Sequence, residues 1–157
     1  MLSKLLKLQW ILLKTLCVHY KYKEIDGKTC IFDVVRRKYI FLTPEEWVRQ
    51  HFVHLLLSNY NFPKSLVRIE SGLNYNKLAK RSDILIYGKD GKPFLLIECK
   101  SSQVPVNQAV IEQASRYNQV LKAPFLAITN GLKTFCFEID FEKNTFLQMK
   151  DLPKYEV

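Results

Sequence analysis

Two acidic side chains and a lysine interrupt or end apolar runs in the middle of this chain of 157 residues. Asp83 begins the run Asp-Ile-Leu-Ile-Tyr, and Glu98 and Lys100 end the run Leu-Leu-Ile-Glu-Cys-Lys. Burying a charge in such a run is costly unless the charge is paired or binds a metal ion. Glu98 and Lys100 are two residues apart, so on a strand their side chains leave the same face, and Cys99 points to the other. With the strands of Asp83 and Glu98 paired in register, two carboxylates and an ammonium group would share one patch.

Such a patch suits hydrolysis of a phosphodiester. Asp83 and Glu98, with the backbone carbonyl of Cys99, can bind a Mg²⁺ (or Mn²⁺) ion that keeps several of its waters. The ion would polarise the phosphate and acidify a bound water, and Lys100 would position that water and offset the developing charge. The competing interpretation is a cross-strand salt bridge between Lys100 and one acid, which a Glu-x-Lys pattern alone does not exclude.

A predicted helix over residues 106–121 brings two more polar side chains. Gln113 and Tyr117 are four residues apart, so they project from the same helical face. That face also carries Ala109, Val110, Ala114 and Val120. We expect it to pack on the sheet, so that the amide and the phenol orient the lysine or contact the substrate backbone. Arg116 beside them could meet a phosphate, although Glu112 offers it an ordinary helix pair. The alternative is a core tyrosine with a glutamine at its rim.

The catalytic patch needs a hairpin and a preceding helix. Residues 82–87 and 93–99 read as strands joined by the turn Lys89-Asp-Gly-Lys92, which predicts an antiparallel pair. Thr43-Pro-Glu-Glu46 is a strong helix start, and this helix should run to about residue 59. Its stripe Val48, Phe52 and Leu55 faces inward. Glu45 extends that stripe towards the helix N-terminus, where an acid is either a favourable dipole partner or part of a site.

The rest of the chain reads as further strands around the same core. We expect strands over 20–24, 30–32, 39–42, 66–70, 125–129 and 134–139, with Asp26-Gly27 as the turn of a first hairpin. No repeat or linker divides residues 19–157, so they should form one α/β domain in which helices flank a mixed central sheet.

Charge and cysteine usage limit the partners and the compartment. Residues 1–80 hold 14 Lys and Arg against 6 Asp and Glu, whereas residues 81–157 hold 10 against 9. A basic first half suits a polyanion such as DNA, and the plainer interpretation is solubility alone. The four cysteines form no CxxC pair, so neither a zinc site nor a disulfide framework is expected, and the reducing cytoplasm is the natural location.

Residues 1–18 are apolar, with lysines on the opposing side. An uninterrupted apolar core, as in a signal peptide or a membrane span, is lacking. The segment instead predicts an amphipathic N-terminal helix that packs on the domain, on a partner, or on a second copy in a homodimer. Binding to a membrane surface is the less favoured interpretation.

These motifs together resemble the PD-(D/E)XK nuclease superfamily, in the RecB-like branch whose Q-x-x-x-Y motif follows the catalytic strand. More narrowly, residues 32–155 resemble the N-terminal nuclease domain of type I restriction enzyme R subunits, in its stand-alone form. The segments that carry this resemblance are Leu42-Thr-Pro-Glu-Glu-Trp-Val-Arg-Gln50, Pro93-Phe-Leu-Leu-Ile-Glu-Cys-Lys100, Gln113-Ala-Ser-Arg-Tyr-Asn118 and Thr129-Asn-Gly131.

The resemblance implies a restriction-endonuclease-like core and a metal-dependent endodeoxyribonuclease. The site residues that it implies are Glu45, Asp83, Glu98, Lys100, Gln113 and Tyr117. Glu45 could add a metal ligand, and its choice over Glu46 rests on its place in the apolar stripe. Glu70 is another acid that the family tends to keep, with either a structural role or a role in supporting the site residues. Ser82 stands where the superfamily motif has proline.

Two functions remain open at this point. The first is a Mg²⁺-dependent DNA endonuclease or nuclease subunit. The sequence has no GxxxxGK[ST] phosphate-binding loop, so a motor and specificity subunits would come from other chains. The second is a non-catalytic DNA-binding or scaffold protein that keeps the nuclease fold, against which the retained acidic pair argues.

Overall fold

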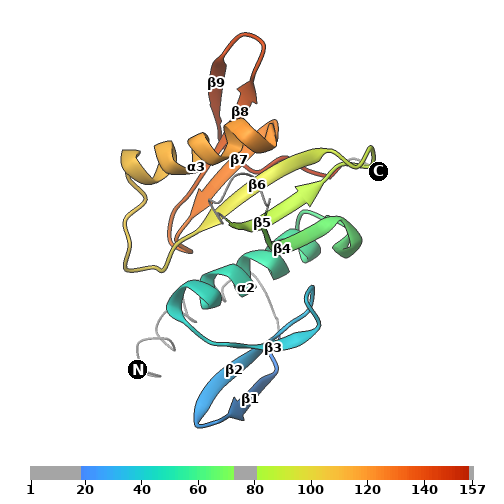
Figure 1. Cartoon of the computed structure of the whole chain (residues 1–157), viewed down its shortest axis with the longest axis vertical. Helices are drawn as coiled ribbons and strands as arrows, with labels where there is room; N and C mark the ends of the chain where they lie inside the picture. Colours follow the sequence, from blue (N-terminus) through green and yellow to red (C-terminus); the bar gives the residue numbers. More distant parts are fainter. Residues whose placement is uncertain (1–18, 73–80, 156–157) are drawn as a thin grey trace.

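A six-stranded sheet forms the centre of the molecule (Figure 1), in a computed structural model that describes residues 19–72 and 81–155. Its strands lie in the order in which they follow one another along the chain. They are β4 (Val67–Gly72), β5 (Arg81–Tyr87), β6 (Pro93–Cys99), β7 (Phe125–Thr129), β8 (Thr134–Asp140) and β9 (Thr145–Met149). Only the β6–β7 pair is parallel, because the chain crosses between these strands through helix α3 (Gln108–Leu121). The predicted mixed sheet and its β5–β6 hairpin are confirmed, and β9 is an addition that was not predicted.

Apolar residues occupy both faces of the central strands, because a helix covers each face. Ile84, Ile86 and Ile97 belong to the core beside α2 (Pro44–Ser58), which packs on β5 and β6. Leu85 and Leu96 belong to a second core beneath α3, which packs on β6 and β7. This arrangement explains why β5 and β6 read as continuous apolar runs, in which a charged residue stands out.

Helix α2 begins where the sequence predicts. Thr43 is the N-cap, and its Oγ1 accepts a hydrogen bond from the backbone N–H of Glu46 at 3.0 Å. Val48 and Phe52 of the predicted stripe are buried, and Leu55 packs partly buried against the same core. The first turn of α2 therefore lies in a fixed position against the sheet.

Helix α3 is rotated relative to the predicted packing face. Its buried residues are Ala114, Asn118 and Leu121, with Val110 and Tyr117 partly buried beside them. Ala109, Gln113 and Val120 are exposed, so the prediction that they face the sheet was wrong. At about 100° per residue, these three side chains point in similar directions, roughly a third of a turn away from the buried residues Ala114, Asn118 and Leu121. Burial of Ala114 and Leu121 determines this orientation.

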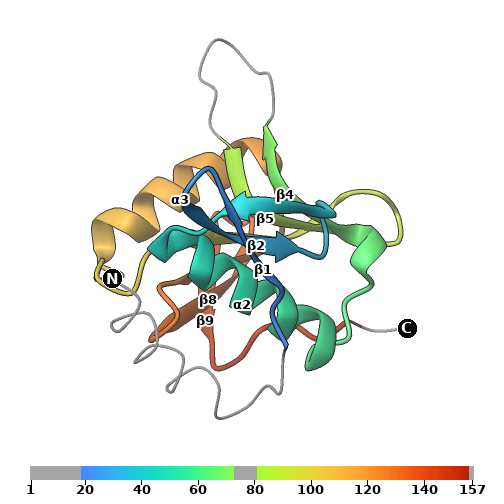
Figure 2. The same ribbon diagram turned by 90° about the horizontal axis from the view of Figure 1, so that it is seen from below.

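A second, three-stranded sheet lies on the other side of α2 (Figures 1 and 2). It consists of β1 (Tyr22–Ile25), β2 (Lys28–Asp33) and β3 (Lys38–Phe41), all antiparallel. The predicted hairpin turn is confirmed, with positive φ angles at Asp26 and Gly27. One face packs on α2, where Ile31 is fully buried and the ring of Tyr22 stacks on Trp47 at 6.5 Å. Short 3-10 helix η1 (Lys64–Leu66) leads into β4.

The predicted N-terminal helix over residues 1–18 lies outside the described residues. Within the described parts of the chain, none of the helices has the length and apolar character needed to cross a lipid bilayer.

Candidate active site

Strands β5 and β6 bring the two acidic residues to the same end of the sheet. Ile84 pairs with Ile97 in this antiparallel hairpin. Asp83, one residue before Ile84, therefore lies opposite Glu98, one residue after Ile97, and their side chains are on the same face of the sheet. Nζ of Lys100 lies 2.8 Å from Oε1 of Glu98, and both side chains are about four-fifths buried. Lys100 therefore does form a salt bridge, but with Glu98 two residues earlier in the chain and not across the strands.

Asp83 is held from two directions. Its Oδ2 accepts a hydrogen bond from the backbone N–H of Cys99 at 2.7 Å. Its Oδ1 accepts one from Nη2 of Arg49, on α2, also at 2.7 Å. The carboxylate of Asp83 thus links the end of β6 to the first half of α2.

Arg49 is the residue of this site that the sequence reasoning missed. Its side chain is only 6% exposed, and its guanidinium contacts three carboxylates, those of Glu45, Glu46 and Asp83. A signal was present, because an arginine in the otherwise apolar part of the helix, four residues after Glu45, requires a partner.

The two neighbouring glutamates of α2 have different surroundings. The side chain of Glu45 is 43% exposed and lies 3.3 Å from Nη2 of Arg49. Burial raises the pKa of Glu45 and the nearby charge of Asp83 raises it further, while Arg49 and Lys100 lower it, so that the net shift is upward. Glu45 is therefore the glutamate that lies among the charges of the patch.

Glu46 belongs to a buried ion-pair network beneath the patch. It accepts hydrogen bonds from Arg36 at 2.6 Å, from Gln50 at 2.8 Å and from Arg49. Arg36 also pairs with Asp33, a fully buried residue at the end of β2. The network runs without interruption from the small sheet, through α2, to Asp83.

The charges of the patch shift one another's pKa values. Burial raises the pKa of Glu98 and the charge of Asp83 adds to this rise, which the bond to Lys100 only partly offsets. Burial alone would lower the pKa of Lys100, but its bond to Glu98 and the nearby acids raise it, so the ammonium form is favoured. An excess of partly buried carboxylates over cations is an environment that favours a further cation.

Tyr117 reaches the patch, whereas Gln113 does not pack against it. Burial raises the pKa of the Tyr117 phenol, hydrogen bonds with Ser82 lower it, and the charge of Glu98 lies close enough to raise it. Gln113 is exposed on α3. Of the Q-x-x-x-Y pair, the structure places only the tyrosine beside the acidic residues. The side chain of Glu70 lies outside the described residues.

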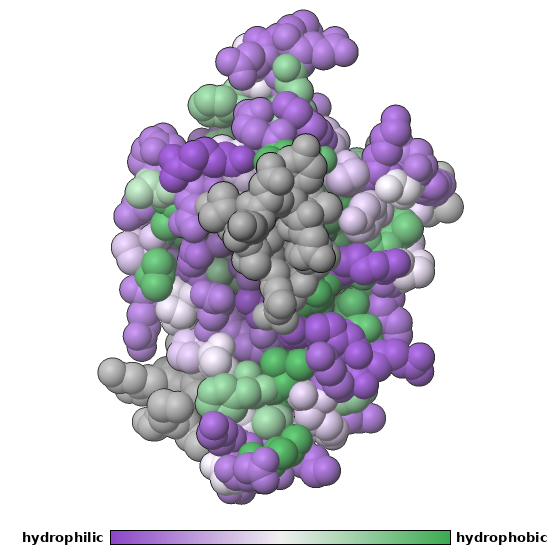
Figure 3. Space-filling model, in the orientation of Figure 1, coloured by the Kyte–Doolittle hydropathy of each residue, from purple (hydrophilic) through white to green (hydrophobic). Residues whose placement is uncertain are grey.

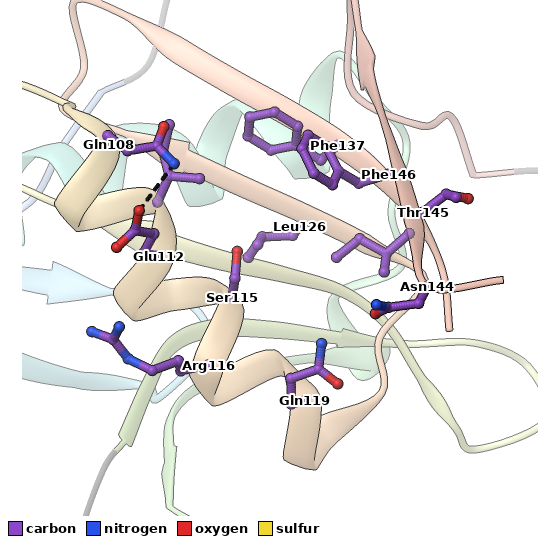
Figure 4. A pocket seen from close by; sticks show the side chains of 12 residues that line it. Gln108, Glu112, Ser115, Arg116, Gln119, Leu126, Phe137, Asn144, Thr145 and Phe146 are labelled. Carbon is purple, nitrogen blue, oxygen red and sulfur yellow. Dashed lines mark hydrogen bonds between the residues drawn. The ribbon is translucent and has the colours of Figure 1, made fainter. Parts of the chain in front are cut away.

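Arg116 lies apart from the carboxylates. It is exposed on α3 and lines a pocket between that helix and β7, β8 and β9 (Figure 4). Glu112, the expected helix partner, accepts a hydrogen bond from Nε2 of Gln108 at 3.1 Å instead. The side chains of Leu126, Phe137 and Phe146 provide apolar surface in this pocket.

The oxygen atoms of the patch suit a hard divalent cation. Asp83, Glu98 and the carbonyl of Cys99 offer the oxygen ligands that Mg²⁺ prefers. Within residues 19–72 and 81–155, no three His, Cys, Asp or Glu side chains form a group that could hold a metal ion. An ion bound by Asp83 would replace its bond to Arg49.

Comparisons with known proteins agree with this fold. Residues 44–153 match the family model described as type I restriction enzyme R protein N terminus (HSDR_N). A fragment of a protein described as an HsdR subunit of a type I restriction enzyme from Vibrio vulnificus YJ016 superposes with a TM-score of 0.52 at 20% identity. The match covers 72% of this chain and 24% of that one, so this chain spans about a quarter of the length of its structural relative. No curated protein sequence matches.

Proposed function

Because this chain belongs to the family of the type I restriction enzyme R protein N terminus, we propose that it is a metal-dependent DNA endonuclease, or the nuclease subunit of a larger enzyme. The observation that carries the proposal is the meeting of Asp83, Glu98 and Lys100 at one end of the β5–β6 hairpin, with Glu45 beside them. This combination of acids and an ammonium group is suited to phosphodiester hydrolysis.

Each side chain has a role in this proposal. Asp83 and Glu98, with the carbonyl of Cys99, would hold Mg²⁺ or Mn²⁺, and Glu45 could add a ligand or hold a water. The bound ion would supply charge for the phosphate and an acidified water. Lys100, which Glu98 keeps protonated, would donate hydrogen bonds to that water or to a phosphate oxygen. Tyr117 would position the start of β5 through Ser82.

Partners are part of the same proposal. These 157 residues contain no GxxxxGK[ST] loop, so movement along DNA would depend on a motor outside them. Recognition of a DNA sequence would likewise come from a specificity subunit.

Plasmid nicking tests the proposal. Supercoiled DNA is incubated with the wild-type chain and Mg²⁺ or Mn²⁺, and with the variants Asp83→Asn and Lys100→Met. Matched controls are Asp90→Asn and Lys92→Met, which change exposed residues of the β5–β6 turn. We expect metal-dependent nicking that falls by about a hundredfold or more in both site variants and persists in both controls. Circular dichroism verifies that every variant is folded. Equal nicking by wild type and Lys100→Met would contradict the assignment.

A non-catalytic DNA-binding function has one observation in its favour. Arg49 already neutralises Asp83, which is the role that a metal ion would have. If this alternative holds, the wild-type chain binds DNA but leaves the plasmid intact with either metal.

A further inference from the structure

The face of the three-stranded sheet that points away from α2 carries aromatic and basic side chains together. Strand register determines this face, because Lys23 lies opposite Cys30, Cys30 opposite Phe41, and Phe32 opposite Tyr39. Side chains that lie opposite each other share a face, and alternate residues along each strand do so too. The outer face therefore consists of Lys23, Ile25, Lys28, Cys30, Phe32, Tyr39 and Phe41.

Two rings of this outer face are exposed to solvent, whereas Phe32 is partly buried and Cys30 is buried. Phe41 is 47% exposed and Tyr39 is 36% exposed. Tyr39 contacts Phe32 edge to face, with ring centroids 5.3 Å apart. Nζ of Lys28 lies 5.5 Å from the centre of the Phe41 ring, in a cation–π contact. Exposed aromatic rings gathered on one surface indicate a contact site.

Basic residues outnumber acidic residues on the exposed parts of this sheet, and two of them, Lys23 and Lys28, lie on its outer face. From residue 21 to residue 41 the exposed charged residues are Lys21, Lys23, Glu24, Asp26, Lys28, Arg37 and Lys38. Five of these seven are basic, and the pair Asp33–Arg36 is turned inward towards α2. In Figure 3, hydrophilic and hydrophobic side chains alternate at the lower end of the molecule, where Figure 1 places this sheet. The surface therefore offers rings for stacking and cations for an anionic chain.

The outer face is attached to the candidate active site. Phe41 ends β3, and Glu45 follows only four residues later in the first turn of α2. The ion pairs of Arg36 with Asp33 and Glu46 fix the other end of the sheet to the same helix. The sheet that carries the outer face is thus joined to the helix that holds Glu45 and Arg49, although the face itself points away from that helix.

We propose that the outer face of β1–β3 binds an unpaired DNA strand, whose bases stack on Phe41 and Tyr39 and whose phosphates meet Lys23 and Lys28. Aromatic rings on an open sheet, surrounded by basic side chains, are the usual means of holding single-stranded nucleic acid. The bases of a duplex are stacked on each other and cannot cover such rings. A base that stacks on Phe41 would displace the Lys28 ammonium from the ring and leave it free to meet a phosphate. The choice of DNA as the bound polymer rests on the proposed nuclease function. The existence of a stacking surface does not depend on that function.

Binding without cleavage tests this inference. Fluorescein-labelled oligo(dT) and a labelled duplex are titrated with the protein in EDTA, and binding is followed by fluorescence anisotropy. We expect oligo(dT) to bind more tightly than the duplex, and Phe41→Ala to weaken binding by about tenfold or more, the usual effect of removing one stacking ring. Lys28→Gln should weaken binding and reduce its salt dependence.

Two variants on the distant β8–β9 hairpin serve as controls. Phe146→Ala removes a ring that is 75% exposed, and Lys143→Gln removes an exposed lysine. Both should bind oligo(dT) like the wild type. The inference is overturned if Phe41→Ala and Phe146→Ala bind alike, or if the duplex binds better than oligo(dT). It is also overturned if sedimentation shows that Phe41→Ala disrupts a dimer and leaves DNA affinity unchanged.

The two proposals fail separately. Loss of oligo(dT) binding in Phe41→Ala, with no nicking by the wild type, would refute the nuclease and keep the binding face. Metal-dependent nicking, with oligo(dT) binding unaffected by Phe41→Ala, would support the nuclease and refute the binding face.

Discussion

The buried guanidinium of Arg49 holds together carboxylates from two parts of the fold. The side chain of Arg49 is 6% exposed, and those of its partners Glu46 and Asp83 are 5% and 13% exposed. The substitution Arg49→Met removes the charge and keeps the length and apolar stem of the side chain. Both carboxylates would then lose their charged partner Arg49 at a place that water reaches poorly, so the folded state should be destabilised.

The contacts of Arg49 indicate the size of this loss. Removing one partner of a buried ion pair costs about 3–5 kcal/mol. Glu46 keeps its hydrogen bonds from Arg36 and Gln50, and Asp83 keeps that from Cys99. The half-exposed partner, Glu45, adds less than about 1 kcal/mol. We therefore expect a loss near the lower end, about 3 kcal/mol, out of the roughly 5–15 kcal/mol of a typical domain.

Urea unfolding followed by circular dichroism measures the loss. The slopes of free energy against urea are compared first, so that a change in midpoint can be read as a change in stability. Arg116→Met, at an exposed arginine of α3, is the control and should change stability by less than about 0.5 kcal/mol. In the double variant Arg49→Met/Asp83→Asn one unpaired charge is gone, so its loss should be smaller than the sum of the single losses by about 1 kcal/mol or more. Losses that simply add, or an Arg49→Met loss as small as that of the control, would refute the reasoning.

Three further predictions concern neighbouring groups. Glu45→Gln should cost less than about 1 kcal/mol of stability but reduce plasmid nicking. At the buried neighbour, Glu46→Gln should cost about 3 kcal/mol of stability. Urea unfolding measures the change in stability, and the nicking assay measures the change in activity. Burial lowers the pKa of His51 to about 4, so the unfolded chain, with a histidine pKa near 6.5, binds more protons between these values. Stability should thus fall by up to about 3 kcal/mol as the pH drops from 6.5 to 4, and His51→Gln should flatten this fall in urea titrations at several pH values. Burial would raise the pKa of Asp33, but hydrogen bonds from Arg36 and Gln50 outweigh it and lower the pKa. Asp33→Asn should therefore cost about 2 kcal/mol of stability at pH 7. The difference in stability between variant and wild type should vanish as the pH falls below about 4 and passes the lowered pKa of Asp33 in the folded state. A difference in stability that stays constant with pH would count against this assignment.

Local sequence patterns predicted the parts of the site that lie close together in the chain. The turn between β5 and β6 and the apolar runs on either side led to a hairpin, and its register placed Asp83 opposite Glu98. Thr43 and the proline that follows it predicted the start of α2. Hairpins and caps are determined within a few residues, so their signals are complete in the sequence.

The tertiary structure decided which side chains meet across longer separations. Arg49 reaches Asp83, which is 34 positions away in the sequence, because α2 packs on the sheet beside β5 and β6. The same packing places Glu45 at the patch and Glu46 in the buried network, a choice that one residue of helical rotation decides. Helix α3 turned Gln113 to solvent because burial of Ala114 and Leu121 determined its orientation. Periodicity in a sequence predicts that a helix has a buried face, but the shape and charge of the surface beneath it select the residues on that face.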